Sequence, residues 1–328
     1  MLSMSCEPTL LYRTMTSTHE APARAPEGTR STAAAAVSVV IVHYQTPELL
    51  ARCLGSLRES RQADDLEVFV VDNASPGFDA EDCRRAFPGV HVIENRENRG
   101  FAVASNQGLR LATGRYLLLL NPDARVEPDT IPVMRDYMDA HPDVGCATAR
   151  VELPDGSLDL ACRRLFPTPE RSFYRMTMLS KAFPRSRRFG QYNLTYLDEA
   201  LETEIDQPCG AFMMVRSEIR DSIGLLDERY FMYGEDTDWA YRMKQAGWRI
   251  MYVPSTTVHH DKRASSRKHR SRTIGYFYDA MRLFYDTHYR AVYPWWVTQA
   301  VHAGVGVRRR IELASNWARG LVPGRTRA

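Results

Sequence analysis

Short blocks of apolar residues, separated by polar turns, make up the first half of the chain. Residues 37–42 form a β-branched run, which predicts a buried strand. Thr46 then stands where it can cap a helix whose first position is Pro47. Leucine and cysteine recur on one helical face across residues 50–57. The pattern therefore predicts a strand, a polar loop and a helix in succession.

The same alternation continues to residue 120. Further strands are predicted at residues 66–71, 91–94 and 116–120, and a further helix at residues 98–112. Strands that alternate with helices predict a mainly parallel sheet. Ligands bind such sheets at the carboxyl ends of the strands. His43, Asp72 and Asp123 follow three of these strands, so we expect the three side chains to converge.

The second half of the chain is less regular and contains an acidic turn. Two further strands and a helix are predicted, at residues 210–215, 249–254 and 238–247. Ahead of the helix, Glu235, Asp236 and Asp238 place three acids within four positions. Such acids repel one another, so a folded protein keeps them solvated, bound to a cation or engaged in proton chemistry. Together with Asp123 at a strand's exit, they suggest a metal-assisted transferase.

Composition narrows the class of protein. The chain has 328 residues, 44% hydrophobic and 25% charged, as in ordinary soluble proteins. A net charge of +3 gives no argument for nucleic-acid binding. Six scattered cysteines without zinc-ligand spacing predict free thiols in a reducing cytosol. No apolar run suits a transmembrane helix and no signal peptide is recognisable, so a cytoplasmic location is expected.

Five segments carry a resemblance to a known family. In their order and spacing they resemble the family 2 glycosyltransferases, and within that family the bacterial rhamnosyltransferases of surface-polysaccharide synthesis. The segments are residues 39–57, 70–75, 98–114 with 116–124, 210–215 and 227–247.

The resemblance implies a GT-A fold. This is an α/β fold with a single Rossmann-like, mostly parallel sheet, flanking helices and, here, a C-terminal helical extension. The Ser-, Ala- and Pro-rich residues 1–36 predict a disordered tail. The resemblance then implies a nucleotide-sugar-binding half over residues 37–150, an acceptor-binding half over 151–265 and the helical extension over 266–328.

The implied activity is an inverting, metal-dependent sugar transfer. The donor would be a nucleoside diphosphate sugar, with dTDP-rhamnose first and UDP- or GDP-sugars as alternatives. The acceptor would be a hydroxyl of a glycan or of a polyprenyl-linked glycan. A nucleotidyltransferase remains an alternative, although the loop at residues 43–47 lacks the glycines and basic residue that hold a triphosphate. A non-catalytic sugar-nucleotide-binding protein is the third hypothesis.

The donor site is assigned by the same resemblance. Asp72 would contact the nucleobase and ribose, and the alternative is an Asx-turn within its own loop. The family's Asp-x-Asp motif is Asn121-Pro122-Asp123 here, so Asp123 alone would contact Mg²⁺ or Mn²⁺. With one carboxylate missing, the ion would arrive with the nucleotide. The remaining nucleotide contacts would be His43, Tyr44, Asn98, Gly100 and Asn121.

A histidine would complete the metal shell. His259 is favoured over the adjacent His260, and the alternative is a surface histidine pair in a basic loop. Arg267, Lys268 and Arg270 either fold over the diphosphate or form a solvated loop.

The acidic turn would serve the acceptor. Asp236 would be the base that accepts the acceptor's proton, and Glu235 would bind the acceptor or orient the base. The alternative is a helix cap, with Asp238 in that role. Gly210 and Ala211 would form a small-residue floor beneath the sugars, or simply pack tightly. Trp239 would stack on the acceptor, or belong to the core.

The C-terminal segment mixes aromatic and basic residues. Trp295 and Trp296 precede an aliphatic stretch and then Arg308, Arg309 and Arg310. Such side chains suit a headgroup interface, which would place the protein peripherally on the cytoplasmic face of the inner membrane. The alternative is a helix docked on the domain or on a second subunit of a homodimer.

Overall fold

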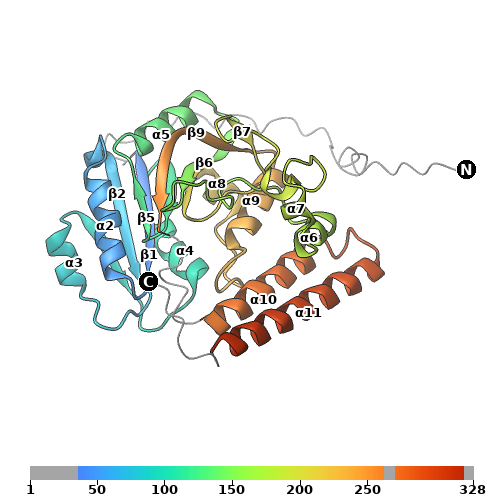
Figure 1. The fold of residues 1–328 in the computed structure, drawn as a ribbon. Helices are drawn as coiled ribbons and strands as arrows, with labels where there is room; N and C mark the ends of the chain where they lie inside the picture. Colours follow the sequence, from blue (N-terminus) through green and yellow to red (C-terminus); the bar gives the residue numbers. More distant parts are fainter. Residues whose placement is uncertain (1–35, 262–269, 321–328) are drawn as a thin grey trace, which may run out of the picture. The chain divides into compact units, whose positions relative to one another are not determined.

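A twisted mixed sheet forms the centre of the molecule in the computed structural model, which describes residues 36–261 and 270–320 (Figure 1). Its strands follow the order β3-β2-β1-β4-β8-β6-β9-β5, and β7 pairs with β9. The strands are β1 Val37–His43, β2 Leu66–Asp72, β3 Val90–Glu94, β4 Tyr116–Leu120, β5 Ala124–Val126, β6 Val144–Glu152, β7 Thr203–Glu204, β8 Phe212–Arg216 and β9 Arg249–His260.

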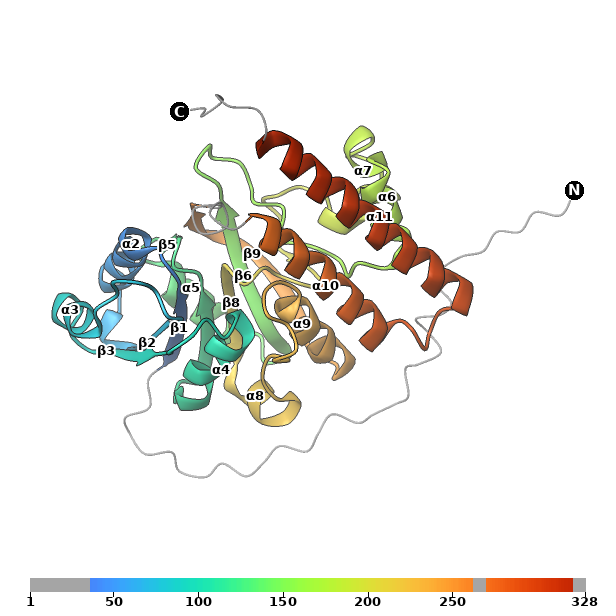
Figure 2. The ribbon, with the colours of Figure 1, turned by 90° about the horizontal axis from the view of Figure 1, so that it is seen from below.

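Helices cover the sheet, and two long ones follow it at the C-terminus. α4 packs against β1 and β2, α5 packs against β6 and β9, and α10 packs against α11, as the two views show (Figures 1 and 2). The helices are α2 Pro47–Arg58, α3 Ala80–Ala86, α4 Phe101–Leu111, α5 Thr130–Ala140, α6 Pro169–Met176, α7 Leu179–Ala182, α8 Ser217–Ile223, α9 Glu235–Gln245, α10 Arg270–His288 and α11 Trp295–Gly320, with 3-10 turns at Ala63–Asp65 and Gln191–Asn193.

The predicted α/β fold with a C-terminal helical extension is confirmed. Strands β1 and β4 are buried along their whole length, as expected of strands covered on both faces. The predicted apolar face of α2 is buried as well. Among the described cysteines, Cys53, Cys146 and Cys162 are buried free thiols. The expected tail, apart from Ala36, lies outside the described residues, as do Arg267 and Lys268.

Two local expectations are corrected. Thr46 is the N-cap residue of α2, but its side chain makes no capping bond; its backbone N–H donates instead to Nε2 of His43, at 3.1 Å. Helix α9 begins at Glu235 rather than at Asp238. Its N-cap is Gly234, whose φ of 85° is a left-handed conformation that glycine adopts readily.

The directions of the strands bring the predicted residues to one edge of the sheet. β1, β2 and β4 are parallel, so their carboxyl ends meet there. β8 runs antiparallel to β4 and pairs Phe212 with Leu120, which places Ala211 at the same edge. β6 and β9 run in the direction of β4, and Ala124 pairs with His260 at the end of β9.

Candidate active site

Asp72 ends β2 as a buried carboxylate held from two sides. Its Oδ1 lies 2.8 Å from Nδ1 of His43, and its Oδ2 accepts from the backbone N–H of Ser75 at 3.0 Å. Because Nε2 of His43 accepts a bond from Thr46, the ring carries its proton on Nδ1 and donates it to Asp72. Burial works to raise the pKa of Asp72, but these hydrogen bonds outweigh it and hold the pKa below its usual value.

His43 therefore differs from the expected nucleotide contact. Its side chain is 1% exposed and both ring nitrogens are engaged within the protein. The ring orients Asp72 and leaves neither nitrogen open to a ligand. Tyr44, the next residue, is half-buried at the same edge. The bond from Ser75 shows that Asp72 fixes its own loop, the expected alternative role, and its contact with a nucleotide stays a prediction.

Asn73 organises the loop that carries Asn98 and Gly100, a role that was not predicted for it. Its side-chain N–H groups donate to Oδ1 of Asn98 at 2.9 Å and to the carbonyl of Gly100 at 3.1 Å. Its Oδ1 accepts from the backbone N–H of Arg99 at 3.0 Å. Gly100 has a φ of 84°, and a Cβ added there would lie 2.5 Å from the carbonyl oxygen of Phe231. Glycine is thus required at this position.

The histidine beside Asp123 is His260. Nε2 of His260 lies 3.2 Å from Oδ1 of Asp123, and Nδ1 lies 3.4 Å from Oδ2 of Asp159. Burial lowers the pKa of His260, but the two carboxylates outweigh it and raise the pKa to about 9. Asp159 was not foreseen. It belongs to the irregular segment after β6, where no sequence period marks it.

The preference for His259 is corrected by this geometry. Both histidines lie within β9, where successive side chains point to opposite faces. Nε2 of His259 lies 2.6 Å from Oε1 of Glu127, on the face away from Asp123. His259 is accordingly a partner of Glu127 and not of Asp123.

Asp123 and His260 offer a partial donor set for a divalent cation. A carboxylate oxygen and an imidazole nitrogen suit Mn²⁺ or Mg²⁺. Asp159 stands where a carboxylate orients a ligating histidine through its other ring nitrogen. Within residues 36–261 and 270–320, no group of three or more His, Cys, Asp or Glu side chains is spaced to hold an ion. The two residues therefore fit a divalent cation only as part of its ligand set. Asn121 contributes to this edge through its backbone, whose N–H donates to the carbonyl of Ala211 at 3.2 Å.

The acidic turn holds one ion-paired and one buried carboxyl group. Oδ2 of Asp236 lies 3.2 Å from Nη2 of Arg164, and Oδ1 accepts from the backbone N–H of Thr237 at 2.7 Å. Glu235 is buried, and its Oε2 has no hydrogen-bond partner among the described residues. Burial first, and then the charge of Asp236, raises the pKa of Glu235 to about 8. At neutral pH Glu235 is thus mostly protonated, while Asp236 is paired with Arg164.

Comparison with known proteins decides the family. The sequence model of "Glycosyl transferase family 2" matches residues 38–218, more than half of the chain. The chain belongs to this family. It is a glycosyltransferase, so the nucleotidyltransferase and non-catalytic hypotheses are set aside.

Curated relatives include rhamnosyltransferases. This glycosyltransferase is 28% identical over 239 residues to the N-acetylglucosaminyl-diphospho-decaprenol L-rhamnosyltransferase of Mycobacterium tuberculosis, covering 70% of this chain and 76% of the relative. It is 26% identical over 240 residues to rhamnosyltransferase WbbL of Escherichia coli, covering 70% and 86%. The predicted resemblance to rhamnosyltransferases is confirmed.

Solved glycosyltransferase structures share the GT-A fold. The mannosyltransferase PcManGT from Pyrobaculum calidifontis, in complex with GDP-Man and Mn²⁺, has a TM-score of 0.50 at 20% identity, covering 89% of this chain and 82% of that one. GalNAc-T7 with UDP, GalNAc and Mn²⁺ has a TM-score of 0.53 at 17% identity over 72% of this chain. The chain spans only 45% of the length of GalNAc-T7.

The three predicted acceptor residues of this glycosyltransferase have different surroundings. Trp239 is 0% exposed and its Nε1–H donates to the carbonyl of Gly224 at 2.9 Å, so the expected stacking on an acceptor is wrong. Ala211 is buried, and its carbonyl accepts the hydrogen bond from the backbone N–H of Asn121. Gly210 is half-buried, and a Cβ added there would make only an ordinary contact of 3.8 Å with Phe101. A floor beneath the sugars stays a prediction.

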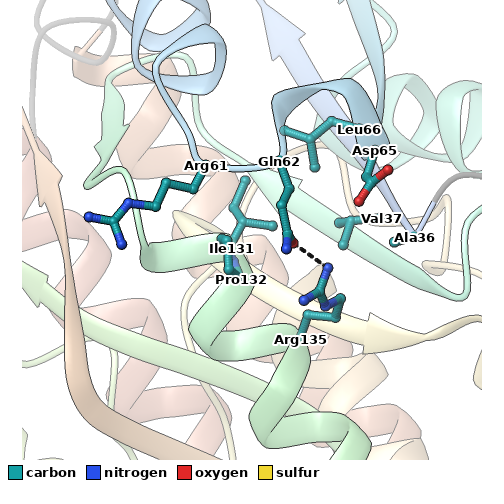
Figure 3. Close-up of a pocket in the computed structure, with 9 residues that line it drawn as sticks. All are labelled: Ala36, Val37, Arg61, Gln62, Asp65, Leu66, Ile131, Pro132 and Arg135. Carbon is teal, nitrogen blue, oxygen red and sulfur yellow. Dashed lines mark hydrogen bonds between the residues drawn. The ribbon is translucent and has the colours of Figure 1, made fainter.

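A recess at the opposite edge of the sheet is separate from this site. It lies where β1 and β2 begin, and its lining includes Val37 and Leu66 (Figure 3). Arg135 donates a hydrogen bond to the side-chain oxygen of Gln62 across it. None of the predicted site residues lines it. The amino ends of these parallel strands are opposite the edge that carries Asp72.

Proposed function

We propose that this glycosyltransferase is inverting and metal-dependent, and that it moves rhamnose from dTDP-rhamnose to a hydroxyl of a glycan or lipid-linked glycan. The observation that carries the proposal is the acidic turn, in which Arg164 holds Asp236 at 3.2 Å and the neighbouring Glu235 is buried. The names of the two rhamnosyltransferase relatives support the choice of sugar. A UDP- or GDP-sugar is the alternative donor.

Asp72 would bind the nucleoside. Its two oxygens are already fixed by His43 and Ser75, and an ionised carboxylate can still accept further bonds from a base N–H or a ribose hydroxyl. The orientation is set before the nucleotide arrives, so less freedom is lost on binding.

Asp123 and His260 would hold the divalent cation together with the donor's diphosphate. When bound, the ion supplies positive charge that stabilises the departing diphosphate. Asp159 would keep the ring of His260 oriented, with Nε2 free to face the ion. His260 must release its Nε2 proton for this purpose, which the approach of a cation favours.

Asp236 would act as the base. The acceptor oxygen attacks the anomeric carbon, the bond from that carbon to the diphosphate oxygen breaks, and the acceptor's proton passes to Asp236. Arg164 fixes the direction of the carboxylate. Glu235 would remain protonated, which spares the turn a second negative charge and offers an O–H to an acceptor oxygen.

The first experiment is a thermal-shift screen of dTDP, UDP, GDP, CDP and ADP, each with and without Mn²⁺. A ligand that binds only the folded state raises its melting temperature. We expect a metal-dependent shift with dTDP. A shift with another diphosphate would move the donor assignment to that base, and no shift with any of them would contradict the nucleotide site.

Matched histidine variants test the metal assignment. His260→Gln should abolish the Mn²⁺-dependent part of the nucleotide shift, whereas His259→Gln, one residue away on the other face of β9, should leave it unchanged. Equal losses in the two variants would refute the assignment of His260.

Asp236→Asn tests the base. The variant should lose sugar transfer by a factor of about 10² or more while nucleotide binding survives. Transfer at the wild-type rate would remove Asp236 from the mechanism.

A further inference from the structure

Helix α11 presents an apolar face to solvent. Trp296, Ala300, Val307, Ile311 and Trp317 recur at helical spacing and are all exposed, with exposed fractions of 61% for Trp296 and 68% for Trp317. A soluble helix normally points this many large apolar side chains inward. A contiguous exposed apolar face of this kind marks an interaction surface.

The orientation of α11 is fixed by its other face. Val305 is buried against Ile274 and Tyr278 of α10, and the hydroxyl groups of Thr298 and Tyr285 lie 3.1 Å apart. The exposed face is therefore not the face that packs on α10. In Figures 1 and 2 the two helices lie side by side along their length.

The charge around the exposed face is positive. α11 contains four arginines and a single acid, Glu312, which accepts a hydrogen bond from Tyr278 at 2.8 Å. Arg309 pairs with Asp279 of α10. Arg310 and Arg319 are exposed and have no ion-pair partner within residues 36–261 and 270–320. At helical spacing Arg310 falls on the exposed face, so tryptophan and aliphatic groups there stand beside a cation that is free to meet anions, and Arg319 adds a second exposed cation at the end of the helix.

We propose that the exposed face of α11 lies flat on an anionic lipid bilayer. Tryptophan rings place their apolar body in the acyl boundary and their N–H among headgroups, and arginines pair with headgroup phosphates. A second copy of the chain is disfavoured as occupant, because a two-fold interface would bring this cationic face against itself. No helix in the described part of the chain is long and apolar enough to cross a membrane, so the contact is a surface one.

The surface is connected to the acidic turn. Asn316, near the C-terminal end of α11, bonds to Ser271 at the start of α10. Tyr276, one turn further along α10, stacks on Phe231 at 4.4 Å between ring centroids, just before Glu235. A bilayer under α11 would hold this turn close to the membrane, which suits a lipid-linked acceptor; that last step rests on the proposed function.

The test uses the full chain and sedimentation with vesicles of phosphatidylcholine, with or without phosphatidylglycerol. Wild-type protein should bind the anionic vesicles and release at high salt. Trp296→Glu combined with Trp317→Glu should lower the partition coefficient by about ten-fold or more, because each change removes an interfacial ring and adds repulsion. Leu201→Glu, an equally exposed apolar residue before β7, is the matched control and should bind as the wild type.

Two further measurements keep the outcomes distinct. Vesicles that carry brominated acyl chains should quench wild-type tryptophan fluorescence, which shows insertion without any variant. Light scattering reports the oligomeric state. If the wild-type protein neither binds the vesicles nor shows quenching, the proposal is overturned. It is also overturned if the protein is a dimer that the double variant disrupts and no vesicle binding is seen. None of the residues assigned to the nucleotide lies on α11, so a nucleotide-induced thermal shift without vesicle binding separates failure here from failure of the donor site.

Discussion

Replacing Glu235 by Gln should remove part of the pH dependence of stability. Glu235 is the first residue of α9, its carboxyl group is buried, and its Oε2 lacks a hydrogen-bond partner in the described structure. Burial, followed by the charge of Asp236, raises its pKa from 4.5 to about 8. Glutamine has the shape of the protonated acid and cannot ionise.

The sign and size of the effect follow from proton linkage. Between the ordinary pKa of 4.5 and about 8 the folded state holds a proton on Glu235 that the unfolded state has released. Glu235 therefore raises the wild-type free energy of unfolding at low pH. This contribution falls by up to about 1.4 kcal/mol per pH unit as the pH rises. From about pH 5.5 to about pH 7.5, Glu235→Gln should gain roughly 2–3 kcal/mol relative to the wild type.

Urea unfolding followed by tryptophan fluorescence measures this difference at several pH values. Glu218→Gln is the control, because Glu218 also lies in the first turn of a helix, α8, but is exposed. Its difference from the wild type should not change with pH. If the free energy of unfolding of Glu235→Gln runs parallel to that of the wild type across this pH range, Glu235 is ionised in the folded protein. Its role as a neutral hydrogen-bond donor is then wrong.

Two further variants test the donor side. His43→Ala removes the donor to Asp72 and an acceptor for a backbone N–H, so it should lower the free energy of unfolding by about 2–5 kcal/mol and weaken dTDP binding in the thermal-shift assay. Gly100→Ala should be more destabilising in urea than Gly77→Ala, because both glycines have positive φ but only at Gly100 would the new Cβ meet the carbonyl of Phe231. Equal losses would show that conformation alone, at about 1 kcal/mol, explains the effect.

The central strands β1 and β4 were predictable because they are buried along their whole length. Such strands read as uninterrupted apolar runs, and residues 37–42 and 116–120 fall within β1 and β4. The placement of Asp72 and Asp123 at the same edge of the sheet followed from parallel topology alone. The antiparallel strand β8 needed the structure, because an apolar run does not state its direction.

The choice between His259 and His260 could not be made from the sequence. Neighbours in a strand point to opposite faces, so the answer depends on the register of β9. The pairing of β9 with β6 shifts register between Ala149 and Arg150, which changes the parity of everything beyond it. The sequence around the two histidines also suggested a loop, whereas β9 continues to His260.

Arg164 and Asp159 were missed for a different reason. Arg164 pairs with Asp236 across 72 positions, and Asp159 approaches His260 across 101. Both lie in the irregular segment after β6, where no period of apolar residues fixes which side chains point inward. Only tertiary contacts bring them to the site.

The segment before Glu235 explains how these distant parts act together. The carbonyl of Phe231 accepts the first N–H of α4, from Phe101 at 2.7 Å, and its ring stacks on Tyr276 of α10. The donor loop at Gly100, the acidic turn and the C-terminal helices therefore share one short stretch of backbone. A substitution of Tyr276 in α10 that shifts Phe231 should therefore change nucleotide-sugar binding and the position of Asp236 together. Tyr276 itself belongs to neither site.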